Sequence, residues 1–339
     1  MKLLWLDLNS SYAHSSLALP ALHAQIADDT TIEWCIVSAT INENTGMVVS
    51  RIHKHRPDII AATNWLFNHE QLLHIISRAK ALLPHCCIVL GGPEFLGNNE
   101  AFLYKNKFVS GVFRGEGEEV FPQWLKVWNH SKETWKSITG LCYLDENGRY
   151  QDNGIARVMN FSQLVSPEKS CYFNWSKPFV QLETTRGCFN TCAFCVSGGE
   201  KPVRTIPLEA IRERLNDIHQ HGIKNVRVLD RTFNYNNKRA KELLDLFRQY
   251  PDICFHLEIH PALLSEELKQ ELSVLPKGLL HLEAGIQSLK ESVLQQSRRI
   301  GKLSDALEGL KYLCSLKNME THADLIAGLP LYHLSEIFE

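Results

Sequence analysis

The sequence of 339 residues contains no long apolar run, and no segment approaches the roughly 18 uninterrupted apolar residues of a membrane-spanning helix. The apolar start, Met1-Lys-Leu-Leu-Trp-Leu6, is broken by Asp7 before it reaches the length of a signal-peptide core, so we predict a first strand there. A large charge of one sign is also absent, because 36 Lys and Arg residues oppose 38 Asp and Glu residues. The charge balance therefore indicates neither a nucleic-acid partner nor an anionic membrane surface.

A disulfide framework is absent as well, because the ten cysteines are unevenly placed and the chain is larger than a typical disulfide scaffold. This pattern favours a reducing compartment, and we expect a cytoplasmic protein. Only Cys188, Cys192 and Cys195 are clustered. The other seven lie singly or as a pair in apolar surroundings and are predicted to be small buried side chains: Cys35, Cys86, Cys87, Cys142, Cys171, Cys254 and Cys314.

The first part of the chain alternates short apolar runs with segments of helical period, which is typical of a parallel sheet covered on both faces. We predict a flavodoxin-like (Rossmann-type) α/β domain over residues 1–135. A hairpin at 138–154, with the turn Asp145-Glu-Asn-Gly148, begins a connecting segment over 136–178. The predicted strands of the first domain are 2–8, 31–39, 58–64, 86–91 and 108–114, and its helices lie near 17–27, 46–56, 69–83, 96–106 and 118–129.

Residues 179–339 repeat the strand–helix alternation, which predicts a (β/α) barrel of the TIM type. The expected strands are 180–184, 226–229, 255–259, 279–283 and 321–326, and the expected helices lie around 207–220, 237–249, 265–273, 288–297 and 303–317.

Three cysteines follow the first strand of this second domain, in Thr184-Thr-Arg-Gly-Cys188-Phe-Asn-Thr-Cys192-Ala-Phe-Cys195. One loop can wrap three thiolates around one metal centre, and thiolates suit an iron–sulfur cluster or zinc. Zinc sites usually add a second cysteine pair at comparable spacing, which the sequence lacks, although zinc and an incidental cysteine cluster stay as alternatives. Three ligands would leave one iron of a [4Fe–4S] cluster open to bind a small molecule and to pass it an electron.

The C-x₃-C-x₂-C spacing after a strand, the Gly187 turn and the aromatic Phe194 resemble the radical S-adenosylmethionine (SAM) superfamily. The resemblance implies that Cys188, Cys192 and Cys195 hold a [4Fe–4S] cluster whose open iron chelates SAM, and that Phe194 lies at this cofactor. It also implies reductive cleavage of a carbon–sulfur bond, which gives a 5′-deoxyadenosyl radical.

Later strands end in motifs similar to those of the same superfamily, and barrel enzymes place their active sites at such strand ends. The resemblance implies that Asp230 accepts a hydrogen bond from the SAM ammonium group and that Glu258 and Glu283 are further SAM ligands. Arg299 resembles the arginine that the superfamily places near the cofactor carboxylate. The alternatives are surface carboxylates or structural ion pairs, and an exposed arginine at a helix end.

The segment Ala323-Asp-Leu-Ile-Ala-Gly-Leu-Pro330 is similar to the fifth-strand motif of the superfamily, but the residues after Pro330 depart from it. The superfamily continues with a glycine, an acidic residue, a helix and a sixth strand. We therefore expect a partial barrel that ends after about five strands. A fragment, a truncated gene product and a chain whose last wall comes from elsewhere are the alternatives.

The first domain resembles the cobalamin (B12)-binding domain of one large radical SAM subfamily, through Asn9-Ser-Ser-Tyr-Ala-His14, Gly91-Gly-Pro-Glu94 and Arg114-Gly-Glu-Gly-Glu118. Glycines let a backbone approach a corrin closely, and helix amino ends favour its anionic part; simple turns before helices are the alternative. His14 lacks the Asp and Gly that flank a cobalt-ligating histidine in such domains, so we expect no protein histidine on cobalt. The resemblance assigns to cobalamin Asn9, Ser10, Thr63, Gly91, Gly92, Glu94, Gly115, Glu116 and Gly117.

These features predict a radical SAM enzyme with a [4Fe–4S] cluster, SAM and cobalamin, which generates a 5′-deoxyadenosyl radical or transfers a methyl group to an unknown substrate. The expected partners are that substrate and a reductant such as flavodoxin or ferredoxin, with no membrane and no nucleic acid indicated. Two alternatives stay open. One is a radical SAM enzyme whose first domain is a degenerate docking domain without corrin, and the other is a truncated, inactive cluster-binding protein.

Overall fold

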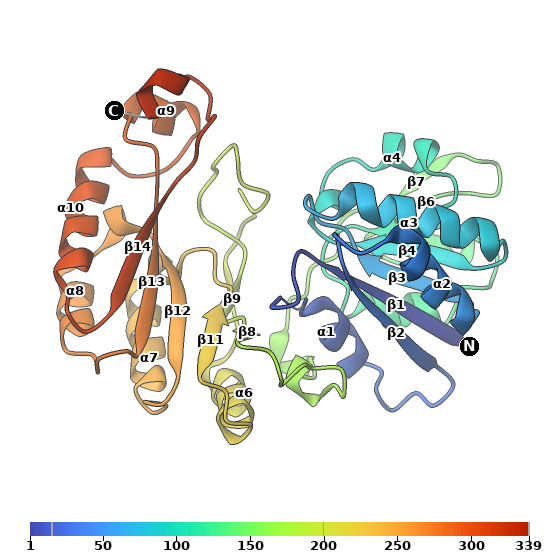
Figure 1. The fold of residues 1–339 in the computed structure, drawn as a ribbon, viewed down its shortest axis with the longest axis horizontal. Coiled ribbons are helices and arrows are strands. Elements are labelled where there is room, and N and C mark those ends of the chain that lie inside the picture. The colour runs from blue at the N-terminus through green and yellow to red at the C-terminus, as the bar shows by residue number, and fades with distance from the viewer. Residues whose placement is uncertain (15, 199, 338–339) are drawn as a thin grey trace. The chain divides into compact units, whose positions relative to one another are not determined.

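The computed structural model describes residues 1–14, 16–198 and 200–337, and the chain divides into two compact units, Met1–Lys177 and Pro178–Glu339 (Figure 1). Each unit is built from a mostly parallel sheet with helices, which confirms the predicted α/β class. None of the described helices is long and apolar enough to cross a membrane.

The first unit contains a seven-stranded sheet in the order β2-β1-β3-β4-β5-β6-β7. The first five strands in this order run parallel, as in the flavodoxin-like fold, whose ligands bind where the strand order reverses between β1 and β3. The strands are β1 Lys2–Asn9, β2 Glu33–Thr40, β3 Ile59–Thr63, β4 Cys87–Gly91, β5 Gly111–Phe113, β6 Leu141–Leu144 and β7 Tyr150–Asp152. The α-helices are α1 Ala18–Ala24, α2 Thr45–His55, α3 His69–Leu82, α4 Glu100–Lys105 and α5 Val120–Leu125, and short 3₁₀ turns are η1 Pro93–Phe95, η2 Thr134–Ser137, η3 Phe161–Gln163 and η4 Pro167–Lys169.

The apolar run of β1 feeds two separate cores because successive side chains of a strand point to opposite faces. Leu4 and Leu6 pack with residues of α2, α3 and α4, whereas Leu3 and Trp5 pack with residues of α1 and α5. The helices thus cover both faces of the sheet, as the continuous apolar character of the strands predicts.

The predicted hairpin belongs to the first unit and enlarges its sheet. β6 pairs antiparallel with β5, and Leu141, Cys142 and Tyr143 are fully buried. Farther along, Ser170 lies 2.9 Å (Oγ) from the Nδ1 atom of His23 on α1. Residues 136–177 are therefore packed against the first unit over much of their length.

The second unit contains a five-stranded parallel sheet in the order β14-β13-β12-β11-β8. These strands are β8 Val180–Leu182, β11 Asn225–Val228, β12 Cys254–Ile259, β13 Leu280–Gln287 and β14 Glu320–Leu325. The helices are α6 Leu208–Gln220, α7 Asn237–Phe247, α8 Glu266–Ser273, α9 Glu291–Gln296 and α10 Leu303–Ser315, with 3₁₀ turns η5 Phe233–Tyr235, η6 Pro261–Leu263 and η7 Leu334–Ile337. The predicted (β/α) fold of this unit is confirmed, and within the described residues its parallel sheet has five strands.

One face of this sheet is apolar and the other is polar. On β12, Phe255, Leu257 and Ile259 are buried, while His256 and Glu258 alternate with them and stay partly accessible. The same alternation holds along β13. Polar side chains thus line the face opposite the apolar core, where a barrel enzyme holds its ligands.

The prediction that seven cysteines are buried is wrong for two of them. Cys86 and Cys142 are buried and Cys35, Cys87 and Cys254 are partly buried, but Cys171 and Cys314 are exposed. Cys314 lies on α10 next to the buried Leu313, so an apolar neighbour in sequence points to the opposite side of the helix.

Candidate functional site

The cysteine loop is closed at its base by a small antiparallel ribbon. β9 Thr185–Arg186 pairs with β10 Arg204–Thr205, so the intervening residues 187–203 form one loop beyond β8. Gly187 has φ +95°, and a Cβ atom there would lie 2.5 Å from the Glu200 carbonyl oxygen. Only glycine fits this close approach of residues 187 and 200. The Cys188 N–H donates a hydrogen bond to the same Glu200 carbonyl at 2.9 Å.

The three cysteine thiols share this loop and influence one another electrostatically. Cys188 and Cys192 are 6% and 5% exposed, and Cys195 is exposed. Burial raises the pKa of Cys188 and Cys192, and the neighbouring thiols add to the increase. Deprotonated thiols crowded in this way favour a cation that compensates their charge, as a metal cluster does.

Arg299 joins the cysteine loop to the end of β13. Its Nη2 atom donates to the Gly285 carbonyl at 2.6 Å, and its charge and hydrogen bonding lower the pKa of Cys192 against the effect of burial. The structure thus brings Arg299 beside the cluster cysteines. Its predicted contact with the SAM carboxylate stays a prediction.

Asp230 is placed differently from what its predicted role suggests. Its carboxylate is 1% exposed and accepts hydrogen bonds from the backbone N–H groups of Thr184 (2.8 Å) and Thr185 (2.9 Å) and from the Thr184 hydroxyl. These donors lie at the root of the cysteine loop. The observed geometry is that of a clasp between β11 and the loop, and the contact with the SAM ammonium group stays a prediction.

Glu258 and Glu283 lie on the polar face of the sheet, in register on β12 and β13. Burial raises the pKa of Glu258 to about 7, an effect that the charge of Arg231 opposes. Glu283 instead accepts a hydrogen bond from His256 at 2.8 Å, and this contact lowers its pKa to about 2. The pKa values of two carboxylates in register are thus shifted in opposite directions, because burial dominates at Glu258 and the hydrogen bond from His256 dominates at Glu283.

Phe194 lies between Cys192 and Cys195 and is 36% exposed. An aromatic ring at this point of the loop is available to a ligand of the cluster. Gly198 allows a close approach within the same loop, because a Cβ atom there would lie 2.5 Å from the Cys192 carbonyl oxygen.

In the first unit, the predicted cobalamin residues at the ends of β1, β3 and β4 lie near the point where the strand order reverses, between β1 and β3. Asn9 and Ser10 follow β1, and the Asn9 amide donates to Asp7 at 2.8 Å. Thr63 and Gly91 end β3 and β4 in register with each other. Gly92 has φ +111°, and a Cβ atom there would lie 2.5 Å from the Asn64 carbonyl oxygen, while Glu94 follows in η1.

The second predicted glycine turn, Gly115 to Gly117, packs against the chain itself. A Cβ atom on Gly115 would lie 2.2 Å from the Ala156 carbonyl oxygen, and one on Gly117 would lie 2.9 Å from Leu22. The Glu116 carboxylate accepts a hydrogen bond from the Val158 N–H at 2.7 Å. These contacts explain why glycine stands at both positions, with no ligand needed. The contact of Gly115, Glu116 and Gly117 with cobalamin stays a prediction.

His14 makes a local contact, with its Nδ1 atom 2.8 Å from the Ser11 hydroxyl. The absence of a histidine ligand on cobalt stays a prediction.

Sequence reasoning missed three histidines on the polar face, His256, His281 and His322, which come from β12, β13 and β14. His281 and His322 are joined by a 3.0 Å contact between Nε2 and Nδ1. The available signal was a histidine two residues before Glu258 and before Glu283, which places each pair on one face of its strand. Strand order, which the sequence does not state, brings the three together.

Comparison with known families agrees with this geometry. Residues 182–338 match the Radical SAM superfamily, and residues 8–125 match the B12 binding domain. The chain is a radical SAM protein with a B12-binding domain. The predicted family and fold are thereby confirmed, and this radical SAM protein carries the cysteine loop inside the first match and the β1, β3 and β4 strand ends inside the second.

Relatives of this radical SAM protein include methyltransferases. An uncharacterized methyltransferase of Pyrococcus horikoshii is 27% identical over 292 residues, which cover 82% of this chain and 62% of the relative. The cobalamin-dependent radical SAM methyltransferase TokK of Streptomyces tokunonensis is 19% identical over 81% of this chain and 43% of its own. The chain thus spans less than two thirds of the length of these curated relatives.

A solved structure with the same fold is that of the radical SAM methyltransferase TsrM from Kitasatospora setae. It superposes with a TM-score of 0.76 at 15% sequence identity, and the match covers 99% of this chain and 69% of that one.

The two matched domains imply a [4Fe–4S] cluster, SAM and cobalamin as cofactors. The residues present fit the cluster, because one loop carries three thiols, two of them buried, and Arg299 stands beside Cys192. Three protein ligands leave one cluster iron available to another molecule.

Proposed function

We propose that this radical SAM protein is a cobalamin-dependent methyltransferase. The observation that carries the proposal is that one chain combines a cluster-type cysteine loop at the end of a barrel strand with a flavodoxin-like B12-binding unit. When bound, the cluster supplies the electron for cleavage of SAM, and cobalamin supplies a carrier for the methyl group.

The chain's own residues would position these groups. Cys188, Cys192 and Cys195 would ligate the cluster, Phe194 and Glu258 would line the SAM site, and Arg299 would hold the SAM carboxylate. Support for this comes from the bond between Arg299 and the Gly285 carbonyl, which fixes the guanidinium beside Cys192. Asp230 would act through the loop that it clasps.

In the first unit, Asn9, Ser10, Thr63, Gly91, Gly92 and Glu94 would form the cobalamin site at the strand ends. Gly115, Glu116 and Gly117 would shape the same unit through their contacts with Ala156, Val158 and Leu22.

The cluster assignment is tested by anaerobic reconstitution and iron analysis. We expect about four irons per chain, with sulfide-to-iron charge-transfer absorbance, and loss of both when Cys188, Cys192 or Cys195 is replaced by Ala. Cys314→Ala is the matched control, because this exposed thiol lies on α10. A complete cluster in the triple cysteine variant would contradict the assignment.

The cobalamin assignment is tested by electron paramagnetic resonance of the cob(II)alamin form. We expect cobalt lines without nitrogen splitting, because His14 lacks the flanking residues of a cobalt ligand. Nitrogen splitting that disappears in His14→Ala would show a histidine ligand. A reconstituted chain that binds no corrin would remove the methyl-carrier role and leave the cluster assignment intact.

Cleavage of SAM requires a reductant and a substrate. We propose flavodoxin or ferredoxin as the reductant and a reducing compartment such as the cytoplasm, since all ten cysteines are free thiols. Anaerobic SAM cleavage with each reductant, followed by mass spectrometry, tests this choice.

A further inference from the structure

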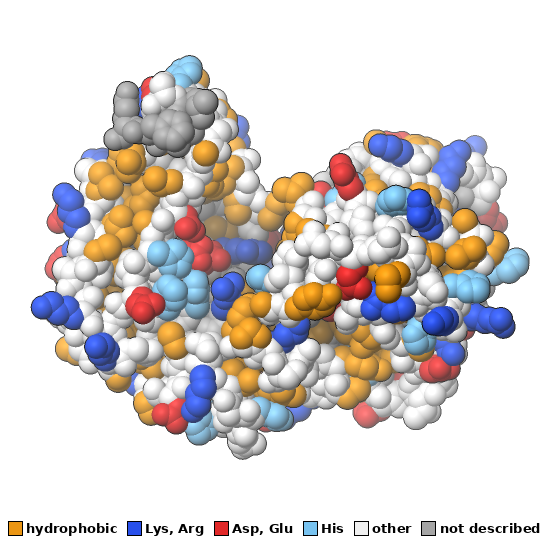
Figure 2. Space-filling model, in the orientation of Figure 1, with side chains coloured by type: hydrophobic (Ala, Val, Ile, Leu, Met, Phe, Trp, Pro, Cys, Tyr) orange, Lys and Arg blue, Asp and Glu red, His pale blue; other side chains and the backbone are white. Residues whose placement is uncertain are grey.

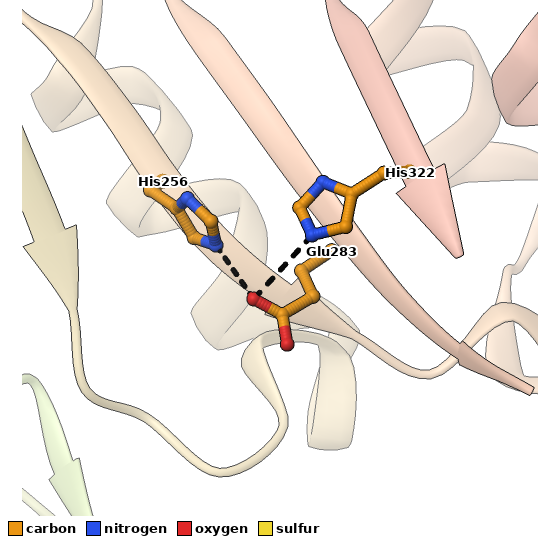
Figure 3. A group of neighbouring side chains, drawn as sticks. All are labelled: His256, Glu283 and His322. Carbon is orange, nitrogen blue, oxygen red and sulfur yellow. Dashed lines mark hydrogen bonds and ion pairs between the residues drawn. The ribbon is translucent and has the colours of Figure 1, made fainter. Parts of the chain in front are cut away.

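Three side chains from three neighbouring strands point toward one another on the polar face of the second sheet (Figure 3). His256 on β12 places its Nε2 atom 2.8 Å from Glu283 Oε2 on β13, and His322 on β14 places its Nε2 atom 3.7 Å from the same oxygen. The three ligand atoms all lie within 4.8 Å of one another.

We propose that His256, Glu283 and His322 form a binding site for a divalent transition-metal ion of the zinc type, separate from the cluster cysteines. Two imidazoles and one carboxylate are a ligand set that such ions take in proteins, at bond lengths of about 2.0–2.2 Å. Ligand atoms on one ion of this kind stand about 3–3.5 Å apart, so the observed separations need only small side-chain rotations.

The contact of His322 with His281 is compatible with the ring form that a metal needs. Its Nδ1 atom lies 3.0 Å from Nε2 of His281, so a proton on Nδ1 can be donated to His281. The Nε2 lone pair then faces Glu283. Metal-bound histidines usually have a hydrogen-bond partner on their second nitrogen in this manner.

Further acidic side chains lie near the three ligands. Glu258 lies in register with Glu283, and Asp324 is hydrogen-bonded to Glu283. The charge of Glu320 opposes the lowering of the His281 pKa by burial. The positive charge of Arg231 lowers the pKa of Glu258, against the effect of burial. Histidine and acidic side chains are visible next to one another on this unit in Figure 2. A divalent cation would balance the carboxylates that the sheet brings together.

The site is accessible and belongs to the same unit as the cysteine loop. The side chains of His256, Glu283 and His322 are 18%, 30% and 42% exposed, so an ion can enter. Glu283 precedes Gly285, the partner of Arg299, by two residues, or about 7 Å of strand. Three protein ligands leave a fourth position for water or for an anionic group of a substrate. The ion would bind the Glu283 carboxylate, which the family resemblance assigns to SAM.

Titration with Co²⁺ tests the proposal. It uses the full-length chain with Cys188→Ser, Cys192→Ser and Cys195→Ser, because the cluster thiolates would compete for the ion. We expect one equivalent of Co²⁺ with d–d bands and no thiolate-to-cobalt charge transfer. Glu283→Gln or His322→Ala should weaken binding by more than about 100-fold, and His281→Ala by about 10-fold. Zinc analysis of the cluster-loaded parent and its Glu283→Gln variant should show the same loss of one ion per chain.

His74→Ala is the control, because this exposed histidine lies on α3 of the other unit and should leave the titration unchanged. Circular dichroism confirms that each variant is folded, and His322→Asn replaces His322→Ala if that variant is not. Absence of Co²⁺ binding at 1:1 stoichiometry overturns the proposal, as does unchanged binding in both Glu283→Gln and the His322 variant. Failure of the parent chain to assemble an iron–sulfur cluster, with Co²⁺ binding retained in the triple variant, would overturn the proposed function without affecting this site.

Discussion

Asp230 connects the end of β11 to the base of the cysteine loop through three donors on Thr184 and Thr185. Replacement by Ala would leave these donors without their acceptor in a buried position, at a cost of about 3 kcal/mol in unfolding free energy of the second unit. We expect Asp230→Ala to lower iron content after reconstitution as well as thermal stability. Iron analysis and calorimetry measure the two effects.

Two milder variants separate the clasp from a direct contact with SAM. Thr184→Val removes one donor only and should cost about 1 kcal/mol. Asp230→Asn keeps one acceptor oxygen and should retain the cluster. If Asp230→Asn holds a full cluster and a rigid loop but fails to bind SAM, the carboxylate contacts the cofactor directly.

Glu258 is the residue whose titration should be visible near neutral pH. Its pKa is raised by burial to about 7 in the folded chain, so folding is favoured while it is protonated, and this contribution is lost as pH rises toward and through 7. In the parent, this effect lowers the free energy of unfolding by on the order of 2 kcal/mol between about pH 4.5 and 7. We expect the Glu258→Gln variant to lack this decrease. Denaturant unfolding of the protein without cofactors, at a series of pH values, measures the difference.

Glu267→Gln is the matched control for this profile, because its carboxylate on α8 is 69% exposed. A pH profile of the Glu258→Gln variant that coincides with that of the parent would contradict the assignment.

At the scale of elements, the cluster depends on the β9–β10 ribbon that closes residues 187–203. Gly187→Ala would push a Cβ atom against the Glu200 carbonyl at a φ of +95°. Because the strain falls on the loop and not on the sheet, we expect the variant to fold but to hold less than half of the parent's iron. Iron analysis and circular dichroism test both parts.

Gly222→Ala provides the comparison for the loop variant. Gly222 also has a positive φ, +71°, but a Cβ atom there meets open space. It should lose about 1 kcal/mol of stability and no iron. Equal iron loss in both variants would show that the close approach at Gly187 is not what closes the loop.

At the scale of the whole molecule, the boundary at Lys177 predicts which fragment folds. Residues 1–177 contain β6, whose Leu141, Cys142 and Tyr143 are fully buried against the sheet. Residues 1–135 lack this strand and would expose the edge of β5. We expect the longer fragment to give dispersed NMR spectra and to bind cobalamin in equilibrium dialysis, and the shorter one to aggregate. A well-folded 1–135 fragment would contradict this prediction.

The local structure and the cysteine motif are readable from the sequence alone. The strand and helix positions follow from apolar periodicity, and the motif from Cys188 to Cys195 needs only a short loop, so both are properties of neighbouring residues. Tertiary structure decided the intramolecular contacts of Asp230 and of Gly115 to Gly117, because their partners lie tens of residues away in the chain. It also decided the grouping of His256, Glu283 and His322, since only the order and register of β12, β13 and β14 bring distant side chains of separate strands to one point.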